Sequence, residues 1–138
     1  HLEAVLGPVA EDLDFIGFQE MRADTDLRAA EPGYLDVGEA GICYARYLQR
    51  AFQRPLLLGY VAVSSHGGWE DEQASALASL LERRVALREA GVFGWVYFQL
   101  FDDPAHTGYF GAAERDFGLI TAERRPKPAL EIFRAFLR

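Results

Sequence analysis

The sequence predicts an α/β fold in which a small parallel sheet is covered by helices. Two unbroken runs, residues 55–64 and 92–101, have the pattern of strands buried on both faces. A shorter run, residues 14–21, has the aromatic and β-branched content typical of a strand. Segments with helical spacing of apolar residues lie before, between and after these runs. This alternation indicates right-handed βαβ units, and therefore parallel strands that alternate with helices.

Length and composition limit the partners and the number of domains. At 138 residues the chain fits a single domain, residues 1–138, with a small core. A net charge of -7 argues against nucleic acid and anionic membranes as partners. No apolar run approaches the ~20 residues of a membrane span and no signal peptide is visible, so the composition assigns no cellular compartment. The single cysteine, Cys43, is expected to be a small buried core residue.

The N-terminal segment is predicted to be a helix or the end of one. Apolar residues recur at helical spacing through residues 2–13, and the Gly7-Pro8 pair predicts a break or kink, because proline clashes with the preceding turn. The chain begins at His1 without a methionine, which suggests a processed, trimmed or recombinant start within a helix. After the first strand comes a polar stretch that is predicted to be a surface loop and contains Asp24, Asp26, Pro32 and Gly33.

The second helix is predicted to start at Asp36 or just after it. Its apolar stripe has three- and four-residue spacing and consists of Ile42, Ala45, Leu48 and Phe52. The second strand follows and opens with Pro55.

The third helix is predicted from the acidic run 70–72, because negative charge is favourable at a helix N-terminus. Its buried face is expected to extend to Val85, and Gly91 supplies the stop. The third strand ends at residues 102–104, Asp-Asp-Pro, and a terminal helix is led by Pro128. The apolar face of that last helix is expected to consist of Leu130, Phe133, Phe136 and Leu137.

Three strands are few for a parallel sheet. Both outer strands of such a sheet would present apolar, unpaired edges, which favour pairing with another chain. The sequence therefore predicts an incomplete unit that self-associates or takes a partner chain.

Several motifs in this order resemble clan A glycoside hydrolases, which are retaining (β/α)8 enzymes of the cellulase-like and β-galactosidase-like families. Residues 55–65, Pro-Leu-Leu-Leu-Gly-Tyr-Val-Ala-Val-Ser-Ser, are similar to the seventh strand, which carries the nucleophile. Residues 14–18 look like the sixth strand, and residues 94–103 like the eighth. Residues 117–120 and 125–129 resemble the following loop and the closing helix. The resemblance spans nearly the whole chain and implies the C-terminal βα units, strands six to eight, of a TIM-barrel glycosidase.

The chain also departs from the family pattern at the nucleophile position and at other positions near the strand ends. The nucleophilic glutamate of the family falls on Tyr60, and the glycine two residues later falls on Ala62. A tryptophan common at the end of the eighth strand falls on Phe98, and an Asn-x-Tyr at the end of the sixth falls on residues 19–21. The acid/base glutamate belongs to a fourth strand that this chain does not contain. Retaining hydrolysis needs two carboxyl groups about 5–5.5 Å apart, so we expect no glycoside hydrolysis by this polypeptide alone.

The resemblance implies a carbohydrate site at the C-terminal ends of the strands. The residues it places there are Gln19, His66, Trp69, Phe98, Asp102 and Asp103. Tyr60 either stacks on a sugar ring or fills the space of the lost glutamate. Glu20 is either a substitute carboxylate or a solvated acid near Arg22. Asp102 and Asp103 either contact a ligand or form a capped turn.

Neither a metal nor a cofactor is expected. His66 has no second histidine nearby, as a metal site would require. The glycines match neither G-x-x-x-x-G-K nor G-x-G-x-x-G, the two phosphate-binding patterns.

Three functional hypotheses follow from these residues. The first is a glycoside-hydrolase-like barrel segment with a possible glycan ligand, catalytically inactive alone because Tyr60 occupies the nucleophile position. The second is a structural or engineered half-barrel fragment that self-associates as a homo-oligomer and has no substrate. The third is one subunit of a two-chain retaining glycosidase, in which a companion barrel chain supplies the other strands and the carboxylate pair.

Overall fold

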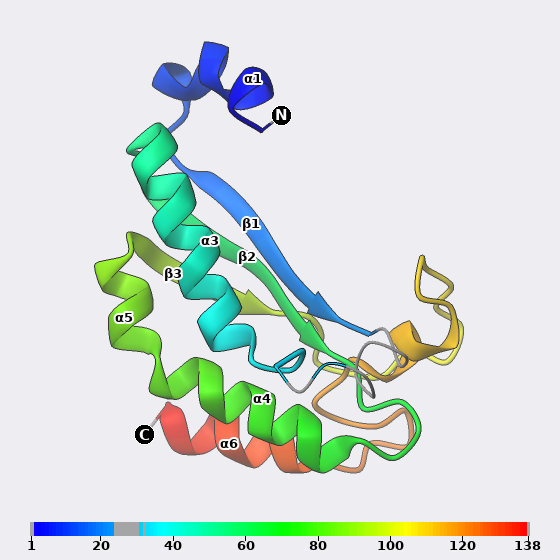
Figure 1. Ribbon diagram of the computed structural model, residues 1–138. Coiled ribbons are helices and arrows are strands. Elements are labelled where there is room, and N and C mark those ends of the chain that lie inside the picture. The colour runs from blue at the N-terminus through cyan, green and yellow to red at the C-terminus, as the bar shows by residue number, and fades with distance from the viewer. Residues whose placement is uncertain (1, 24–30, 32, 138) are drawn as a thin grey trace.

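In the computed structural model, which describes residues 2–23, 31 and 33–137, three parallel strands alternate with helices (Figure 1). The elements are, in chain order, α1 (Leu2–Leu6), the 3-10 helix η1 (Gly7–Asp12), β1 (Ile16–Arg22), α3 (Val37–Phe52), β2 (Leu56–Val63), α4 (Glu70–Glu82), α5 (Arg84–Glu89), β3 (Val92–Tyr97), the 3-10 helix η2 (Ala112–Asp116) and α6 (Pro128–Phe136). The sheet order is β1-β2-β3, and both pairs are parallel. The predicted α/β class is confirmed.

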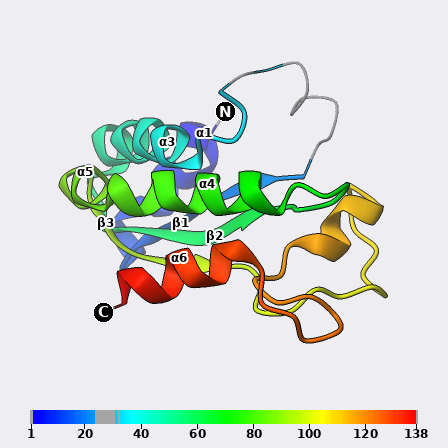
Figure 2. The same ribbon diagram turned by 90° about the horizontal axis from the view of Figure 1, so that it is seen from below.

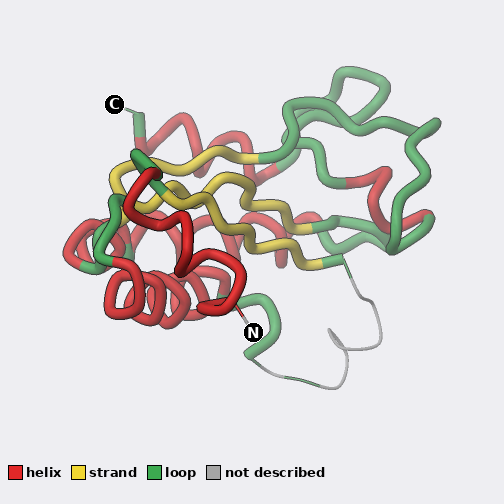
Figure 3. The backbone as a smooth tube through the Cα atoms, turned by 90° about the horizontal axis from the view of Figure 1, so that it is seen from above, coloured by secondary structure: helices red, strands yellow, loops and turns green. Residues whose placement is uncertain are grey.

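The helices follow one another around one side of the sheet. Helix α4 packs against α3 on one flank and against α6 on the other (Figure 2). The loops that leave the C-terminal ends of the strands gather at one end of the molecule (Figure 3). This arrangement is the one that brings functional residues together in parallel α/β folds.

The N-terminal segment breaks where proline predicts it. Helix α1 ends at Leu6, and η1 begins at Gly7 with Pro8 in its first turn. Strand β1 starts at Ile16, two residues later than predicted. Gly33 lies in a turn, whereas the other named residues of the predicted loop, Asp24, Asp26 and Pro32, lie outside the described residues.

Helix α3 begins as predicted. The Asp36 side chain caps it by accepting a hydrogen bond from the Glu39 N–H at 3.1 Å. The stripe Ile42, Ala45, Leu48 and Phe52 is buried, which confirms the apolar face. The prediction for Cys43 is wrong, because this side chain is exposed. One helical position is a rotation of about 100°, which turns Cys43 away from the face that Ile42 buries.

The third predicted helix is two helices in the structure, because the chain turns at Arg83 between α4 and α5. The turn changes the direction in which the side chains of the following residues point around the helix axis. Val85 is consequently 59% exposed, contrary to prediction, and Leu87 is buried in its place. Gly91 ends α5 with a φ of +94°, so the predicted stop is confirmed.

Strand β3 is shorter than its apolar run and is not covered on both faces. It ends at Tyr97, whereas the prediction extended to Phe101. Phe93 is 61% exposed, so the expectation of burial on both faces is wrong for this strand. In α6, Leu130 is buried but Leu137 at its end is exposed.

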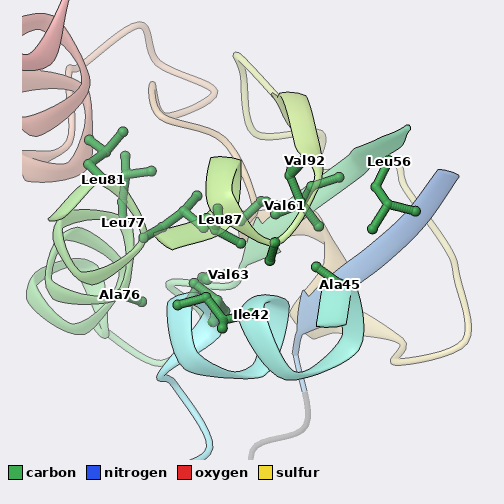
Figure 4. Close-up of a cluster of buried hydrophobic side chains, with 14 of the residues drawn as sticks. Ile42, Ala45, Leu56, Val61, Val63, Ala76, Leu77, Leu81, Leu87 and Val92 are labelled. Carbon is green, nitrogen blue, oxygen red and sulfur yellow. The ribbon is translucent and has the colours of Figure 1, made fainter. Parts of the chain in front are cut away.

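The main core lies between the sheet and the helices, as Figure 4 shows. Strand β2 contributes Leu56, Val61 and Val63 to this core, which also contains Ile42 of α3 and Leu77 of α4. A second, smaller cluster at the strand ends consists of Ala23, Ala62, Ala113 and Phe117. Across the described ranges, none of the helices combines the length and the apolar composition that crossing a membrane requires.

Candidate functional site

A β-bulge at Gly59 determines where Tyr60 points. Phe18 of β1 pairs with Leu58, but the next residue, Gln19, pairs with Tyr60, so Gly59 is an extra residue in β2. Side chains alternate along a strand, and without the bulge Tyr60 would share the buried helix side with Leu58. With the bulge, Tyr60 lies on the opposite side of the sheet and is 45% exposed.

Three of the predicted site residues share that open side of the sheet. Gln19 is exposed and lies beside Tyr60 in the ladder. Phe98, directly after β3, makes an edge-to-face contact with Tyr60 at a ring-centroid distance of 5.6 Å. The phenol and the amide can donate hydrogen bonds, and the rings offer a surface for stacking.

Apolar side chains fill the space next to this aromatic pair. Phe98 contacts the buried ring of Phe117 at 6.1 Å, and Ala62 is buried in the same cluster. Met21 and Phe110 pack against it. The strand ends are therefore lined on the open side by hydrophobic groups.

Glu20 is buried on the other side of the sheet. Its partner in β2 is Val61, a residue of the main core, and only 2% of Glu20 is exposed. Its carboxylate is 2.5 Å from the Arg22 guanidinium. Burial raises the pKa of Glu20 and the charge of Arg22 opposes part of that rise. Arg22 is thus its partner as expected, but the expectation of a solvated acid is wrong, and the carboxylate faces the helix layer, opposite to Tyr60.

His66 is held in the loop between β2 and α4. Its Nδ1 lies 2.5 Å from the Asp116 carboxylate, and its backbone N–H donates to Ser64 Oγ at 3.0 Å. Gly67 and Gly68 both have positive φ, which lets the loop turn sharply into α4. Trp69 is the half-buried residue that precedes α4.

The two aspartates after β3 have different surroundings. Asp102 accepts hydrogen bonds from Lys127 Nζ at 2.7 Å and from the Gly118 N–H at 2.8 Å. Burial raises the pKa of Asp102, and Lys127 and the Gly118 N–H oppose part of the rise. Asp103 is exposed and accepts from the Ala105 N–H at 3.0 Å, which is the capped turn that the sequence predicted as one alternative.

Lys127 is a central residue of this region that the sequence did not reveal. Its side chain is 1% exposed, and its ammonium also donates to Ser65 Oγ at 2.7 Å and to the Asp116 carbonyl at 3.3 Å. It joins the loops after β2 and β3 to the start of α6. Lysine is rarely fully buried, and nothing in the local sequence marks this one as paired.

A polar cavity of about 380 Å³ lies beside these loops. Its lining includes Ser65, His66, Asp102, Asp116 and Lys127, whereas Tyr60, Phe98 and Gln19 do not line it. Of the predicted site residues, only His66 and Asp102 line this cavity, and Trp69 and Asp103 line neither it nor the open side of the sheet.

A second histidine–carboxylate pair fixes the outer part of the loop before α6. His106 Nε2 lies 2.9 Å from the Glu114 carboxylate, which also accepts from the Phe110 N–H at 2.7 Å. Burial raises the pKa of Glu114, but these two donors outweigh it and the net pKa is below the usual value. Asp116, the partner of His66, and Glu114 both belong to η2, so two histidines anchor this short helix.

The lack of carboxylates on the open side of the described sheet limits the chemistry that this arrangement can perform. No strand position on the open side of the described sheet carries an aspartate or a glutamate, and the described residues hold no group of three histidine, cysteine or acidic side chains suited to a metal. Stacking and hydrogen bonding by Gln19, Tyr60 and Phe98 are available there.

The fold defines the class of protein: three successive βα units of a (β/α)8 barrel. No family model and no curated protein matches the sequence. Among solved structures, the chain is similar to a GH5_18 protein from Bifidobacterium longum subsp. longum, with a TM-score of 0.64 and 16% identity over 87% of this chain.

Two further barrels agree with this assignment. An exo-β-1,4-mannosidase from Opitutaceae bacterium strain TAV5 gives a TM-score of 0.63 and 22% identity over 90% of this chain. A β-glucuronidase from Bifidobacterium dentium gives a TM-score of 0.65 and 16% identity, also over 90% of this chain. The chain spans 29%, 22% and 20% of the three structures, in the order given. The chain therefore has the fold of part of a glycoside-hydrolase barrel, as the sequence resemblance implied.

Proposed function

We propose that this chain contributes the C-terminal strands of a carbohydrate-binding (β/α)8 barrel and does not hydrolyse glycosides by itself. The observation that carries the proposal is the position of Tyr60. It lies on the open side of β2, at the place where the resemblance puts the nucleophilic glutamate, and 45% of it is exposed. A tyrosine there can stack or donate a hydrogen bond, but it does not supply one of the two carboxylates that retaining hydrolysis needs.

The surroundings of Tyr60 support binding without hydrolysis. Phe98 stands edge-to-face to it, and Gln19 is next to it in the sheet, so one aromatic surface and one amide point the same way. Glu20 is the acid nearest in sequence to Gln19, and its side chain lies on the helix side with Arg22. The similar structures include a mannosidase and a glucuronidase, which is why β-linked glycans are the class to test.

The experiment combines a binding assay with a turnover assay. Soluble β-linked manno- and gluco-oligosaccharides are titrated into the parent chain and the Tyr60→Ala variant by calorimetry. We expect the parent to bind with roughly tenfold higher affinity than the variant, because the stacking surface is lost. Tyr47→Ala, an exposed tyrosine on the outer side of α3, is the matched control and should bind like the parent.

Turnover is measured with aryl β-glycosides on the parent and on Tyr60→Glu. We expect the parent to release no product. Release by the parent would refute the non-hydrolytic proposal. Release by Tyr60→Glu alone would show that the geometry of the site survives and that an acid is available from elsewhere.

A structural role without a substrate is the second candidate. The apolar cluster around Phe117 favours it, since hydrophobic groups occupy the strand ends where a sugar would otherwise have polar contacts. Absence of glycan binding by the parent chain would support this candidate. The two-chain glycosidase is the third, and it requires a companion chain to bring both carboxylates.

A further inference from the structure

A tyrosine that is almost fully exposed lies at the tip of the loop between β3 and η2. Tyr109 is 94% exposed, and its ring contacts the ring of Phe110 edge-to-face at a centroid distance of 5.0 Å. This loop, coloured yellow to gold in Figure 1, extends beyond the C-terminal ends of the strands. Because the tip projects past the strand ends, an additional strand at either edge of the sheet would not cover it.

The loop holds this ring in a defined position. The buried carboxylate of Glu114 accepts a hydrogen bond from the Phe110 N–H at 2.7 Å and lies 2.9 Å from His106 Nε2. The Gly111 N–H donates to the Gly108 carbonyl at 3.1 Å and closes the tip. A Cβ at Gly108 would overlap the Glu114 carboxylate, so the tip packs directly on this buried group. An aromatic ring that is held in place in this way loses little conformational entropy when it binds a partner.

A series of apolar contacts connects Tyr109 with Tyr60. Phe110 packs against the cluster that contains Phe117, and Phe98 contacts Phe117 at 6.1 Å and Tyr60 at 5.6 Å. The two exposed rings therefore lie at opposite ends of one hydrophobic cluster. Since other aromatic rings separate them, a single sugar ring does not cover both, whereas two units of one glycan chain can.

The composition of the loop tip defines the chemistry of its partner. Residues 107–113, Thr-Gly-Tyr-Phe-Gly-Ala-Ala, carry no charged side chain. The tip therefore offers no ion pair to a phosphate, a carboxylate or an ammonium group. A phenol ring offers an apolar face for stacking and a hydroxyl for a hydrogen bond, which suits a neutral, polyhydroxylated ring.

We propose that Tyr109 is a second stacking position for the glycan whose first stacking position is Tyr60, so that the chain binds oligosaccharides in preference to disaccharides. This inference rests on the carbohydrate binding proposed above and adds the length of the glycan to it. Two contacts made by one ligand reinforce each other, because the second forms within a complex that the first already holds together.

The test compares two lengths of the same glycan by calorimetry. The ligands are β-1,4-linked mannobiose and mannohexaose, with cellobiose and cellohexaose as a second series. We expect Tyr109→Ala to lower the affinity for the hexasaccharides about fivefold and to leave the affinity for the disaccharides unchanged, because only the longer chain reaches the loop tip. Tyr60→Ala should weaken the binding of both lengths.

Two further variants isolate the contribution of the ring. Tyr109→Phe keeps the stacking surface and should bind the hexasaccharides like the parent. Tyr47→Ala removes an exposed tyrosine from α3 and should also bind like the parent. Because Tyr109 is exposed, its replacement leaves no cavity in the core, and circular dichroism checks that each variant is folded. NMR spectra with isotope-labelled tyrosine rings should show the Tyr109 signal shifting with hexasaccharide and not with disaccharide.

The possible failures of the two proposals are distinguishable. Absence of glycan binding by the parent would refute the proposed function and this inference with it. Hexasaccharide binding that Tyr60→Ala weakens and Tyr109→Ala does not would refute this inference alone. An equal loss for both lengths in Tyr109→Ala, or an equal loss in Tyr109→Phe and Tyr109→Ala, would also overturn it. A lower average molar mass of Tyr109→Ala in sedimentation, with unchanged glycan affinity, would assign the ring to self-association.

Discussion

At the scale of single residues, a one-residue insertion separates the site from the core. Gly59 is the bulge that places Tyr60 on the open side while Leu58 and Val61 both face the helices. A bulge changes which face each later residue occupies. The sequence-based alternatives for Tyr60 both assumed an open-side position, and the bulge is the physical reason that it has one.

Glu20 gives a pH-dependent prediction. Its folded pKa is raised above 4.5, so the folded state binds a proton more tightly than the unfolded state. The resulting stabilisation is present below pH 4.5 and is lost as the pH rises through the folded pKa. Relative to the parent, Glu20→Gln should therefore gain unfolding free energy between pH 4.5 and pH 7, by about 1.4 kcal/mol for each unit by which the pKa is raised.

The measurement for Glu20 is urea unfolding of both proteins at several pH values. The difference between the two unfolding free energies isolates this one group from the other acids of the chain. A difference that is constant over the range, or one that shrinks as the pH rises, would contradict burial of an ionisable Glu20.

At the scale of elements, two glycines of α3 respond oppositely to the same substitution. A Cβ at Gly38 would lie 3.0 Å from the Ser79 carbonyl oxygen and 3.2 Å from Leu80 Cα, both backbone atoms of α4. A Cβ at Gly41 would meet only side chains, the nearest being Leu87 Cδ2 at 3.4 Å. Gly38 therefore permits the close approach of α3 and α4, whereas Gly41 has room for a methyl group.

We expect Gly38→Ala to lower the melting temperature and Gly41→Ala to leave it unchanged or raise it. Alanine favours a helix interior by up to about 1 kcal/mol over glycine, and only at Gly38 is this gain opposed by backbone contacts that must open. Thermal unfolding followed by circular dichroism compares them directly. Equal gains at both positions would show that α3 and α4 are less tightly packed than the distances imply.

The elements also show which structural features local sequence patterns predict. The break at Pro8, the cap at Asp36 and the stop at Gly91 follow from local stereochemistry, and all three are present. The turn at Arg83 and the exposure of Val85 depend on contacts that are distant in sequence. Arg83 pairs with Asp36 at 3.0 Å and with Ser79 Oγ at 2.7 Å, and no local motif marks that position as a helix end.

At the scale of the whole molecule, the sheet has two unlike free edges. The β1 edge carries the Glu20–Arg22 pair, whereas the β3 edge carries the exposed ring of Phe93, which contacts Phe15 edge-to-face at 5.7 Å. Exposed apolar edges favour association, and a lysine on an edge strand opposes it.

We expect the chain to self-associate at micromolar concentration through the β3 edge, and Phe93→Lys to lower the average molar mass toward that of one chain. Tyr109→Lys is the control, because Tyr109 is the more exposed aromatic residue but lies in a loop away from that edge. Sedimentation velocity of the three proteins at matched concentrations measures the effect. A monomeric parent, or an equal effect of both substitutions, would count against association by this edge.

The sequence by itself determined the alternation of strands and helices, because apolar periodicity and turn chemistry are local properties. Its motifs resemble a glycosidase barrel, and that resemblance implied three successive parallel strands. The tertiary structure decided the rest of the site. The bulge at Gly59, the burial of Glu20 on the helix side and the ammonium of Lys127 between three loops all depend on which distant segments meet. Side-chain burial and pairing arise from packing between segments far apart in the chain, and for that reason residue types alone did not reveal them.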